Sequence, residues 1–464
     1  MSTATINASA DVNSGNTGKF PSQIKFIVGN EACERYSYYG MKSILVIFMI
    51  QVLLMQEGES TWTYHQFSSL CYLFPVLGAF ISDRIWGKYK TIIVLSLVYC
   101  AGHAVLALWE NKTGLYAGLF LIALGSGGIK PCVSAHVGDQ FKKGQEAMLA
   151  KVFNLFYFMI NFGSFFSTLI TPWTLKYYGP SVAFGIPGIL MFLATFVFWL
   201  GRHQYVHVPP SKSDGNGFMA VLKTCFTTPG KPGQSFFERA VTKHGQEGAE
   251  GAQAVWDITK VFAAVSMFWA LFDQHGSSWV IQASKMDLMF MGIPFEASQI
   301  SAWNPIMVMV LIPIFTMGVY PALEKMGFGL TPLRRMTIGM FVAAFAFVFA
   351  AGIQMQLDAG NQLNVMWQFF PYLIMTIAEV MVSITGLEFA YTQAPRSMKS
   401  SIMSMWLLTV FFGNQLVSLV VKVEEKIPVA STGYFFFFAG TMALAALIFA
   451  FMASKYKVRN YMQA

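Results

Sequence analysis

Residues 181–201, SVAFGIPGILMFLATFVFWLG, form an uncharged apolar run, and residues 202–256 that follow it are polar. A helix of about 20 apolar residues is long enough to cross the hydrocarbon core of a bilayer. The polar stretch includes Pro209 and Pro210 and has no apolar run of about 18 residues. We therefore expect a membrane span that ends at a linker, with further spans on either side.

The composition of the whole chain agrees with a membrane protein. Charged residues make up 12% of the 464 residues, apolar residues 55% and aromatic residues 16%, and the mean hydropathy is +0.51. The charged share is about half of that usual in soluble proteins. Because so few charges could not cover a water-facing surface, we exclude a soluble enzyme, a disordered chain and a nucleic-acid-binding protein.

Twelve apolar stretches are long enough to be spans, and they predict an all-α polytopic membrane protein. The first and the tenth are long and carry charges, which indicates tilted or extended helices. The expected spans are 26–56, 64–83, 91–110, 114–133, 150–172, 181–201, 257–275, 298–320, 333–353, 365–390, 401–421 and 432–453.

The distribution of Lys and Arg predicts the orientation of these spans. With the N-terminus in the cytoplasm, the inner segments hold 22 of these cations and the outer loops hold 5. Cytoplasmic loops carry the excess of Lys and Arg, so we expect both termini in the cytoplasm. The expected parts are a tail (1–25), a six-helix bundle (26–201), a cytoplasmic linker (202–256), a second six-helix bundle (257–453) and a tail (454–464). Two six-span halves joined by a basic loop are typical of the major facilitator architecture, although a channel could share this plan.

Neither a metal site nor a disulfide framework is suggested by the five cysteines, because they form no CxxC pair. We expect no metal and no cofactor. The polar residues 1–25 contain no apolar run before a cleavage site, so no cleaved signal peptide is expected.

The first span carries charges that are costly in a membrane, which marks them as functional candidates. At helical spacing Glu31, Glu34, Arg35, Tyr38 and Lys42 share a stripe about 100° wide. Two carboxylates and two cations on one stripe can pair locally, and closely placed carboxylates are suited to hold and pass a proton. A purely structural ion cluster is the alternative.

Three other spans contribute polar candidates. In the fourth, residues 125–131 read GSGGIKP, where small residues allow close helix packing. Lys130 then stands at membrane depth or extends to the cytoplasmic surface. The fifth places Phe153, Tyr157, Asn161 and Ser164 on one face. The seventh holds Trp269 and Asp273 one turn apart, and a plain interfacial carboxylate is the alternative for Asp273.

The tenth span holds two carboxylates, Glu379 and Glu388. Nine residues of a regular helix place them on opposite faces, so only one should reach a central cavity. Glu388 has Tyr391 and Thr392 on its side, so we expect Glu388 in the cavity and a structural role for Glu379.

Histidine titrates near neutral pH, so each histidine in a span is a candidate for proton handling. His65 opens the second span on the outer side, with Tyr72 two turns further on. His103 lies mid-span without an evident charged partner, and we expect a hydrogen-bonded core residue there.

Several of these motifs resemble signatures of one family, the proton-dependent oligopeptide transporters of the major facilitator superfamily. The sequence EACERYSYYG at 31–40 is similar to the first-helix motif ExxER[FY]xxYG of this family. GAFISDRIWGKYKT at 78–91 is similar to its second-to-third-helix signature, and FYFMINFG at 156–163 resembles its fifth-helix motif FYxxINxG. GSGGIKP at 125–131 and GLEF at 386–389 are weaker matches.

The resemblance implies roles for the matching residues. Proton coupling would involve Glu31, Glu34 and Arg35, together with His65 and Asp273. Lys130 and Glu388 would face each other across the cavity and form part of a cytoplasmic gate, whereas His65, Lys42 and Asp273 would belong to an outer gate. The expected substrate-binding residues are Tyr39, Lys42, Tyr72, Lys130, Tyr157, Asn161, Trp269, Asn304, Glu388 and Thr392.

The chain departs from the family pattern in two places. The family usually has Arg where this chain has Lys42, so bidentate hydrogen bonding to a carboxylate is lost at this position. Many bacterial members carry an extra two-helix hairpin between the halves, and residues 202–256 are too polar to contain one.

The sequence thus predicts a symporter of protons and di- and tripeptides in the inner membrane of a cell, working by alternating access. The nearest alternative is a transporter of the same family for another anion, such as nitrate or a conjugated metabolite. A membrane-embedded enzyme is the alternative from another class, but no HExxH, GxSxG or paired-His spacing is present. A passive channel would not need a proton-titrating cluster. The expected partners are peptide, protons and the bilayer, and no nucleic acid.

Overall fold

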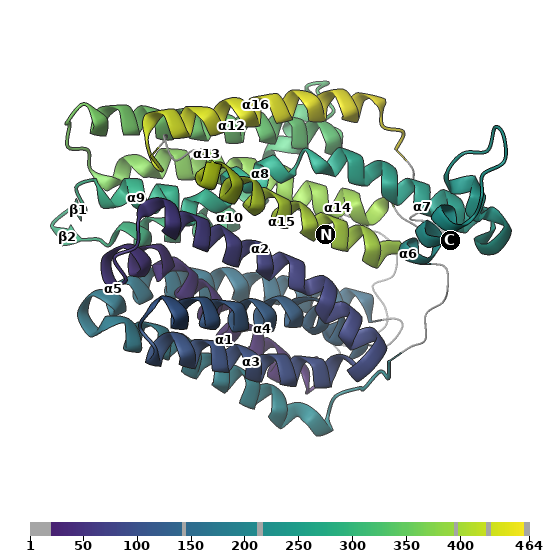
Figure 1. The fold of residues 1–464 in the computed structure, drawn as a ribbon, viewed down its shortest axis with the longest axis horizontal. Coiled ribbons are helices and arrows are strands. Elements are labelled where there is room, and N and C mark those ends of the chain that lie inside the picture. Colours follow the sequence, from purple (N-terminus) through teal and green to yellow (C-terminus); the bar gives the residue numbers. More distant parts are fainter. Residues whose placement is uncertain (1–19, 142–144, 211–216, 394–397, 424–427, 459–464) are drawn as a thin grey trace.

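The computed structural model describes residues 20–141, 145–210, 217–393, 398–423 and 428–458, and helices dominate it (Figure 1). Tyr391 lies on a helix, but its side chain is outside the description, so its expected place beside Glu388 stays a prediction. Some of the Lys and Arg residues used for the orientation, including those at 19 and 212, also lie outside the described residues.

Five long helices form the N-terminal half. Their apolar stretches contain Gly and Pro, which terminate or bend helices. In order they are α1 (Ile24–Ile47), α2 (Glu57–Ile81), α3 (Lys88–Leu108), α4 (Lys112–Asp139) and α5 (Glu146–Leu200), with the short turns η1 (Phe48–Val52), η2 (Ser82–Trp86) and η3 (Gly201–His203) between or after them.

The C-terminal half contains shorter and more broken helices. Its α-helices are α7 (Val241–Ala263), α8 (Ser266–Phe272), α9 (Ser278–Ser284), α10 (Trp303–Pro313), α11 (Tyr320–Lys325), α12 (Pro332–Asp358), α13 (Phe369–Glu379), α14 (Thr385–Thr392), α15 (Lys399–Val423) and α16 (Thr432–Lys455). Its short turns are η5 (Asp273–Gly276), η6 (Ala297–Ala302), η7 (Ile314–Val319), η8 (Val365–Gln368) and η9 (Val380–Ile384).

The two halves lie side by side. Figure 1 shows α1–α5 in the lower part and α12, α13 and α16 in the upper part, with α2 and α15 at the junction. The hairpin of β1 (Met289–Phe290) and β2 (Ile293–Pro294) lies at one end, which we call the hairpin end. The opposite end, where α6 (Phe218–Thr227) and η4 (Phe237–Ala240) project, is called the linker end.

The hairpin is a small departure from the expected all-α fold. Met291 and Gly292 both have positive φ, at 50° and 80°. Two consecutive residues with positive φ are what the tightest hairpin turn requires. The strands are two residues long and pair antiparallel.

Eight helices within the described residues are long and apolar enough to cross a membrane, or nine if the bent pair 237–263 and 266–284 counts as one span. The expected number of twelve spans is therefore not confirmed and stays a prediction. Charges explain part of the difference, because α1 contains Glu31, Glu34, Arg35 and Lys42. Another part of the difference arises because one continuous helical stretch, 151–203, includes two expected spans and is counted once.

Gly179 separates these two expected spans inside α5. It has φ 80° and ψ 176°, a conformation that suits glycine, and Pro180 follows it. The run of α5 is therefore two helices that meet at a break, where the sequence-based boundaries place a short loop.

Close helix contacts depend on glycine, as expected for the stretch 125–131. A Cβ atom built on Gly78 of α2 would lie 2.1 Å from the carbonyl oxygen of Gly128 on α4. A Cβ on Gly125 would lie 2.6 Å from the Cβ of Tyr99 on α3. Small residues at such positions let helix backbones approach closely in membrane proteins.

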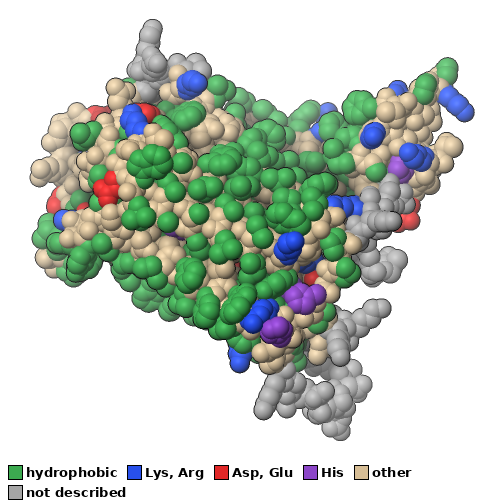
Figure 2. All heavy atoms as spheres, turned by 60° about the horizontal axis from the view of Figure 1, so that its bottom comes forward, with side chains coloured by type: hydrophobic (Ala, Val, Ile, Leu, Met, Phe, Trp, Pro, Cys, Tyr) green, Lys and Arg blue, Asp and Glu red, His purple; other side chains and the backbone are tan. Residues whose placement is uncertain are grey.

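The surface fits burial in lipid. Figure 2 shows hydrophobic side chains over the middle of one face, with Lys and Arg side chains toward its edges. Large exposed apolar side chains include Phe192, Leu444 and Phe451. Contiguous apolar surface of this extent marks contact with a membrane or a partner.

Candidate functional site

A cavity of about 240 Å³ lies between the two halves, near the hairpin end. Its walls come from α1, α2 and α5 on one side and from α8, η5, α10 and α13 on the other. Eight of the residues predicted for binding or proton coupling line it: Tyr39, Lys42, Tyr72, Tyr157, Asn161, Trp269, Asp273 and Asn304.

Glu379 also lines this cavity, contrary to the expectation that Glu388 is the carboxylate of this span that reaches it. Asn304 donates a hydrogen bond from Nδ2 to Glu379 Oε2 at 2.8 Å and lies 3.1 Å from Thr376 Oγ1. Tyr372, Thr376 and Glu379 follow one another at spacings of four and three residues, so they share a helix face. This polar stripe on α13 was present in the sequence and predicts the inward face better than the neighbours of Glu388.

Glu388 was expected in the cavity, and the structure places it elsewhere. It lies half-buried on α14, after the π-helical turn η9. It is not among the described residues that line the central cavity. Thr392, also predicted for binding, donates a hydrogen bond to the Phe389 carbonyl at 2.8 Å and lines a groove at the linker end. The expectation that only one of the two carboxylates reaches the central cavity agrees with this placement, but the choice of Glu388 was wrong because it relied on neighbours such as Thr392, which lines the other groove.

The first-helix charges form the expected cluster. Arg35 Nε lies 2.7 Å from Glu31 Oε1 and 2.9 Å from Glu34 Oε2. Glu31 and Glu34 are buried, and a second cavity of about 760 Å³ has Glu31 and Arg35 in its wall. Lys42 shares the helix stripe but pairs with another element.

Lys130 points into the helix bundle and contacts two tyrosine rings, which favours the reading at membrane depth over extension to the surface. Its Nζ lies 4.6 Å from the ring centre of Tyr38 and 4.7 Å from that of Tyr72. Such cation–π contacts compensate partly for lost hydration. Lys130 lines the second cavity beside Glu31 and Arg35, so the expected pairing across a cavity with Glu388 is not formed in the described structure.

An ion pair closes the hairpin end of the central cavity. Lys42 Nζ on α1 lies 3.1 Å from Asp273 Oδ1 on η5, which joins the two halves. Asp273 is only 5% exposed, so the reading of a plain interfacial carboxylate is wrong. Lys42 also lies over the ring of Tyr64, 5.1 Å from its centre.

Asn414 on α15 connects this ion pair to His65 on α2. Its Nδ2 donates to Asp273 Oδ2 at 2.6 Å, and its Oδ1 lies 2.7 Å from His65 Nδ1. Because Oδ1 only accepts, His65 carries its proton on Nδ1, and its Nε2 accepts from the hydroxyl of Ser277 at 2.8 Å. Sequence reasoning missed Asn414 and Ser277; a polar Asn within the expected span 401–421 was the available signal.

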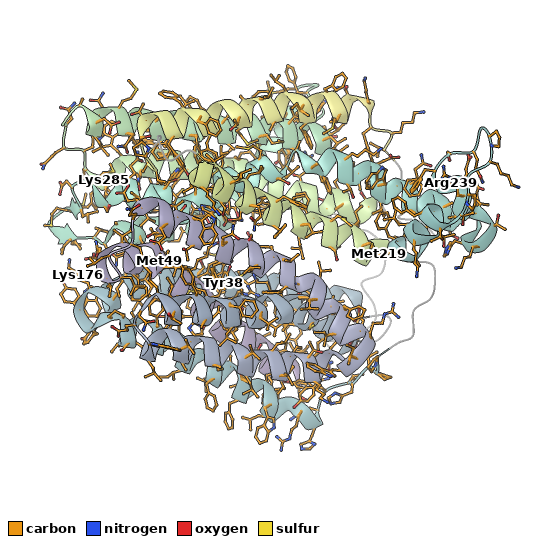
Figure 3. All side chains as sticks on the ribbon, viewed as in Figure 1. Tyr38, Met49, Lys176, Met219, Arg239 and Lys285 are labelled. Carbon is orange, nitrogen blue, oxygen red and sulfur yellow. The ribbon has the colours of Figure 1, made fainter. Side chains whose placement is uncertain are left out.

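Further contacts between the halves surround this chain of hydrogen bonds. Lys176 pairs with Glu296 at 2.6 Å and Lys285 with Glu57 at 3.0 Å, and both lysines lie at the hairpin end (Figure 3). Gln66 on α2 and Gln415 on α15 exchange amide hydrogen bonds of 3.1 Å. The hairpin end is thus tied across the halves.

His103 is the hydrogen-bonded core residue that the sequence predicts. Ser37 donates to the Pro187 carbonyl at 2.6 Å, so His103 Nε2, 2.9 Å from Ser37 Oγ, is the donor in their contact. This chain ties α1, α3 and α5 together. Within the described ranges, no group of three or more His, Cys, Asp and Glu side chains is placed to hold a metal ion.

A family profile described as the POT family matches residues 89–437 of the sequence. This chain belongs to the POT family. Its relatives include "Peptide transporter 3" of Caenorhabditis elegans, 37% identical over 361 residues, which cover 73% of this chain and 51% of that protein. "Solute carrier family 15 member 1" of Canis lupus familiaris is 39% identical over 376 residues, 73% of this chain and 52% of that protein. The chain therefore spans about half the length of the curated relatives it matches.

Solved POT family structures share the fold over nearly the whole chain. A structure titled as an auto-inhibited POT family peptide transporter has a TM-score of 0.91 at 40% identity, covering 96% of this chain and 99% of that one. A structure of the POT family transporter PepTSo has a TM-score of 0.90 at 40% identity, covering 96% and 100%. The resemblance inferred from the motifs is confirmed at the level of the family.

Proposed function

We propose that this chain transports di- and tripeptides together with protons by alternating access between two six-helix bundles, residues 26–201 and 257–453. The observation that carries the proposal is the cavity between the halves, which presents a carboxylate from one half, Glu379, and a cation from the other, Lys42. Relatives of this chain that are named as peptide transporters support the same substrate class.

A peptide of any sequence has one ammonium and one carboxylate at fixed positions of its backbone. Glu379 is suited to the ammonium, and Lys42, with Lys130 of the neighbouring cavity, is suited to the carboxylate. The aromatic walls, including Tyr39 and Tyr157, offer area without fixed hydrogen-bond patterns. Side chains of the peptide would therefore be discriminated weakly.

Proton coupling is assigned to the buried ion pairs. Protonation of Glu31 or Glu34 weakens its attraction to Arg35, and protonation of Asp273 weakens its attraction to Lys42. A proton gradient can bias only those conformations that bind protons differently. A membrane potential near 100 mV adds roughly 2.3 kcal/mol for each charge that is moved.

The excess of Lys and Arg in the inner segments supports placing the linker end and both termini in the cytoplasm, at a cell inner membrane. The hairpin end then faces outward, and its contacts between the halves support a state closed to the outside. The ion pair of Lys42 and Asp273 is then an outer gate. No enzymatic role is proposed.

Uptake into liposomes tests the proposal. Purified full-length chain is reconstituted, and accumulation of a labelled dipeptide and tripeptide is followed with an inward proton gradient, without a gradient, and with the gradient collapsed by a protonophore. Gradient-dependent accumulation of peptide is expected. Accumulation of nitrate but not of peptide would favour the alternative anion, and uptake that ignores the gradient would contradict proton coupling.

A further inference from the structure

A groove of about 880 Å³ lies at the linker end of the C-terminal half, away from the central cavity. It is bounded by the start of α12, by α14, and by the end of α16 with the residues that follow it. Figure 1 shows the end of α16 at the upper right, with α14 lower on the same side. None of the described residues that line the central cavity belongs to this groove.

The walls of the groove are mainly apolar and continue the lipid-facing surface. Ala450, Ala453, Phe389 and Ile338 line it, and Ile338 is 40% exposed. Phe451 on α16, 60% exposed, continues this apolar surface outside the groove. A hydrocarbon chain placed here would extend the contact that the helices already make with the bilayer.

The polar part of the groove is cationic. Arg334 is the charged residue among the described lining residues, which also include Thr331 and Thr337. One of its N–H groups faces the Gly329 carbonyl at a long 3.4 Å, whereas a guanidinium has five donors.

Further cations lie near the mouth of the groove. Lys455 and Lys457 are exposed, and Lys455 Nζ lies 4.0 Å from the ring centre of Phe451. A long basic side chain packed on an apolar ring at the end of a membrane helix places its charge at the level of lipid headgroups.

We infer that this groove is a binding site for an anionic phospholipid, with the phosphate at Arg334 and an acyl chain between α12 and α16. Basic pockets between membrane helices suit anionic headgroups, and each Lys or Arg adds to the attraction. A zwitterionic lipid carries its own cation in the headgroup, so its attraction to the site is weaker. A soluble phosphate leaves the apolar walls uncovered, so only the contact with Arg334 contributes to its binding.

The position of the groove connects such a lipid to the helix that follows the cavity. Phe389, Thr392 and Gln393 form its α14 side, and Tyr456 donates a hydrogen bond to Gln393 at 3.2 Å across the groove. The segment α13–η9–α14 joins this wall to Glu379. A bound lipid would therefore stabilise the placement of that segment.

Lipid binding to the full-length chain in detergent tests the inference without any transport measurement. Native mass spectrometry and thermal unfolding are recorded with added phosphatidylglycerol, phosphatidylcholine, or glycerol 3-phosphate. Phosphatidylglycerol should bind and raise Tm, and the other two should do so much less. An equal effect of phosphatidylcholine, or an equal effect of glycerol 3-phosphate, would overturn the inference.

Two pairs of variants locate the site. Arg334→Gln should weaken phosphatidylglycerol binding about fivefold, as expected for the loss of one basic contact, whereas Arg202→Gln removes the same charge at η3 in the other half and should leave binding unchanged. Ala453→Phe should block the groove, whereas Ala445→Phe adds the same bulk to α16 outside it. Unchanged binding in Arg334→Gln, or equal loss of binding in both arginine variants, contradicts the proposed lipid site. The arginine pair tests the site even if Ala453→Phe fails to fold.

Discussion

Lys42 and Asp273, which are far apart in the sequence, meet at 3.1 Å between Nζ and Oδ1 and join the two halves of the molecule. Both side chains are largely shielded from water, so the ion pair loses hydration that an exposed pair keeps. Removing one partner of a buried pair leaves the other charge uncompensated, at a cost of about 3–5 kcal/mol. We therefore propose that the pair controls whether the hairpin end stays closed.

Charge exchange tests this contact. Asp273→Lys places two cations together and should reduce gradient-driven peptide uptake at least about tenfold. The double variant Lys42→Asp with Asp273→Lys should recover part of the uptake, because the attraction is restored in the opposite sense. The exposed pair of Lys285 and Glu57 is the matched control, since exchange there should change uptake little. If the double variant, folded and inserted, recovers nothing, the two residues do not form the gate.

The two carboxylates of the tenth expected span should differ in their effect on substrate binding. Glu379→Gln keeps a hydrogen-bonding group beside Asn304 but removes the charge that faces the cavity. We expect peptide affinity, measured by calorimetry on purified protein, to fall roughly 10- to 100-fold, as for loss of a charged hydrogen bond. Glu388→Gln should lower it much less, and equal losses in both variants would refute the cavity assignment.

Asn414 should be required for the arrangement of His65 and Asp273. Asn414→Leu removes both the acceptor of His65 Nδ1–H and a donor to Asp273. Uptake should fall, and its dependence on external pH should change, because the two titratable groups lose their shared neighbour. Gln415→Leu, one residue further on α15, is the control for bulk and should retain the pH profile. An unchanged profile in Asn414→Leu would show that this contact only supports packing.

The comparison of sequence and structure separates local from long-range information. The stripe of Glu31, Glu34 and Arg35 was predictable, because residues three and four apart on one helix are neighbours. The contact of His65 with Asn414 was not, because it depends on how α2 packs on α15. Helix periodicity gives the face of a residue but not the partner across an interface.

The choice between Glu379 and Glu388 failed because it relied on the neighbours of Glu388, and Thr392 lines a different groove. The π-helical turn at Val380–Ile384 interrupts the regular 100° rotation per residue, yet only Glu379 of the two is among the described residues that line the central cavity. Local stripes on each side of the turn remain valid, and the stripe that ends at Glu379 is the one that reaches the cavity.

Neutralising a first-helix carboxylate should separate transport from its driving force. Glu31→Gln or Glu34→Gln removes one charge of the cluster around Arg35. Proton-driven accumulation in liposomes should be lost, whereas counterflow, the exchange of labelled for unlabelled peptide without a gradient, should survive better. Neutralising the exposed Glu59, which pairs with Lys112 on the surface, is the control. Equal loss in both assays would mean that the cluster is structural.

Gly78 should be irreplaceable because α2 and α4 touch through their backbones. A Cβ atom at Gly78 would lie 2.1 Å from the carbonyl oxygen of Gly128, and backbone atoms cannot give way as a flexible side chain can. Gly78→Ala must therefore push the two helices apart, and overpacking of this kind costs about 1–3 kcal/mol. Tm of the purified protein should fall measurably. Gly352→Ala is the matched control, because a Cβ there meets no atom within 4 Å in the described structure and alanine favours a helix. Gly352→Ala should leave Tm unchanged or raise it, so an equal decrease in both variants would mean that helix flexibility, and not the contact with Gly128, is what Gly78 provides.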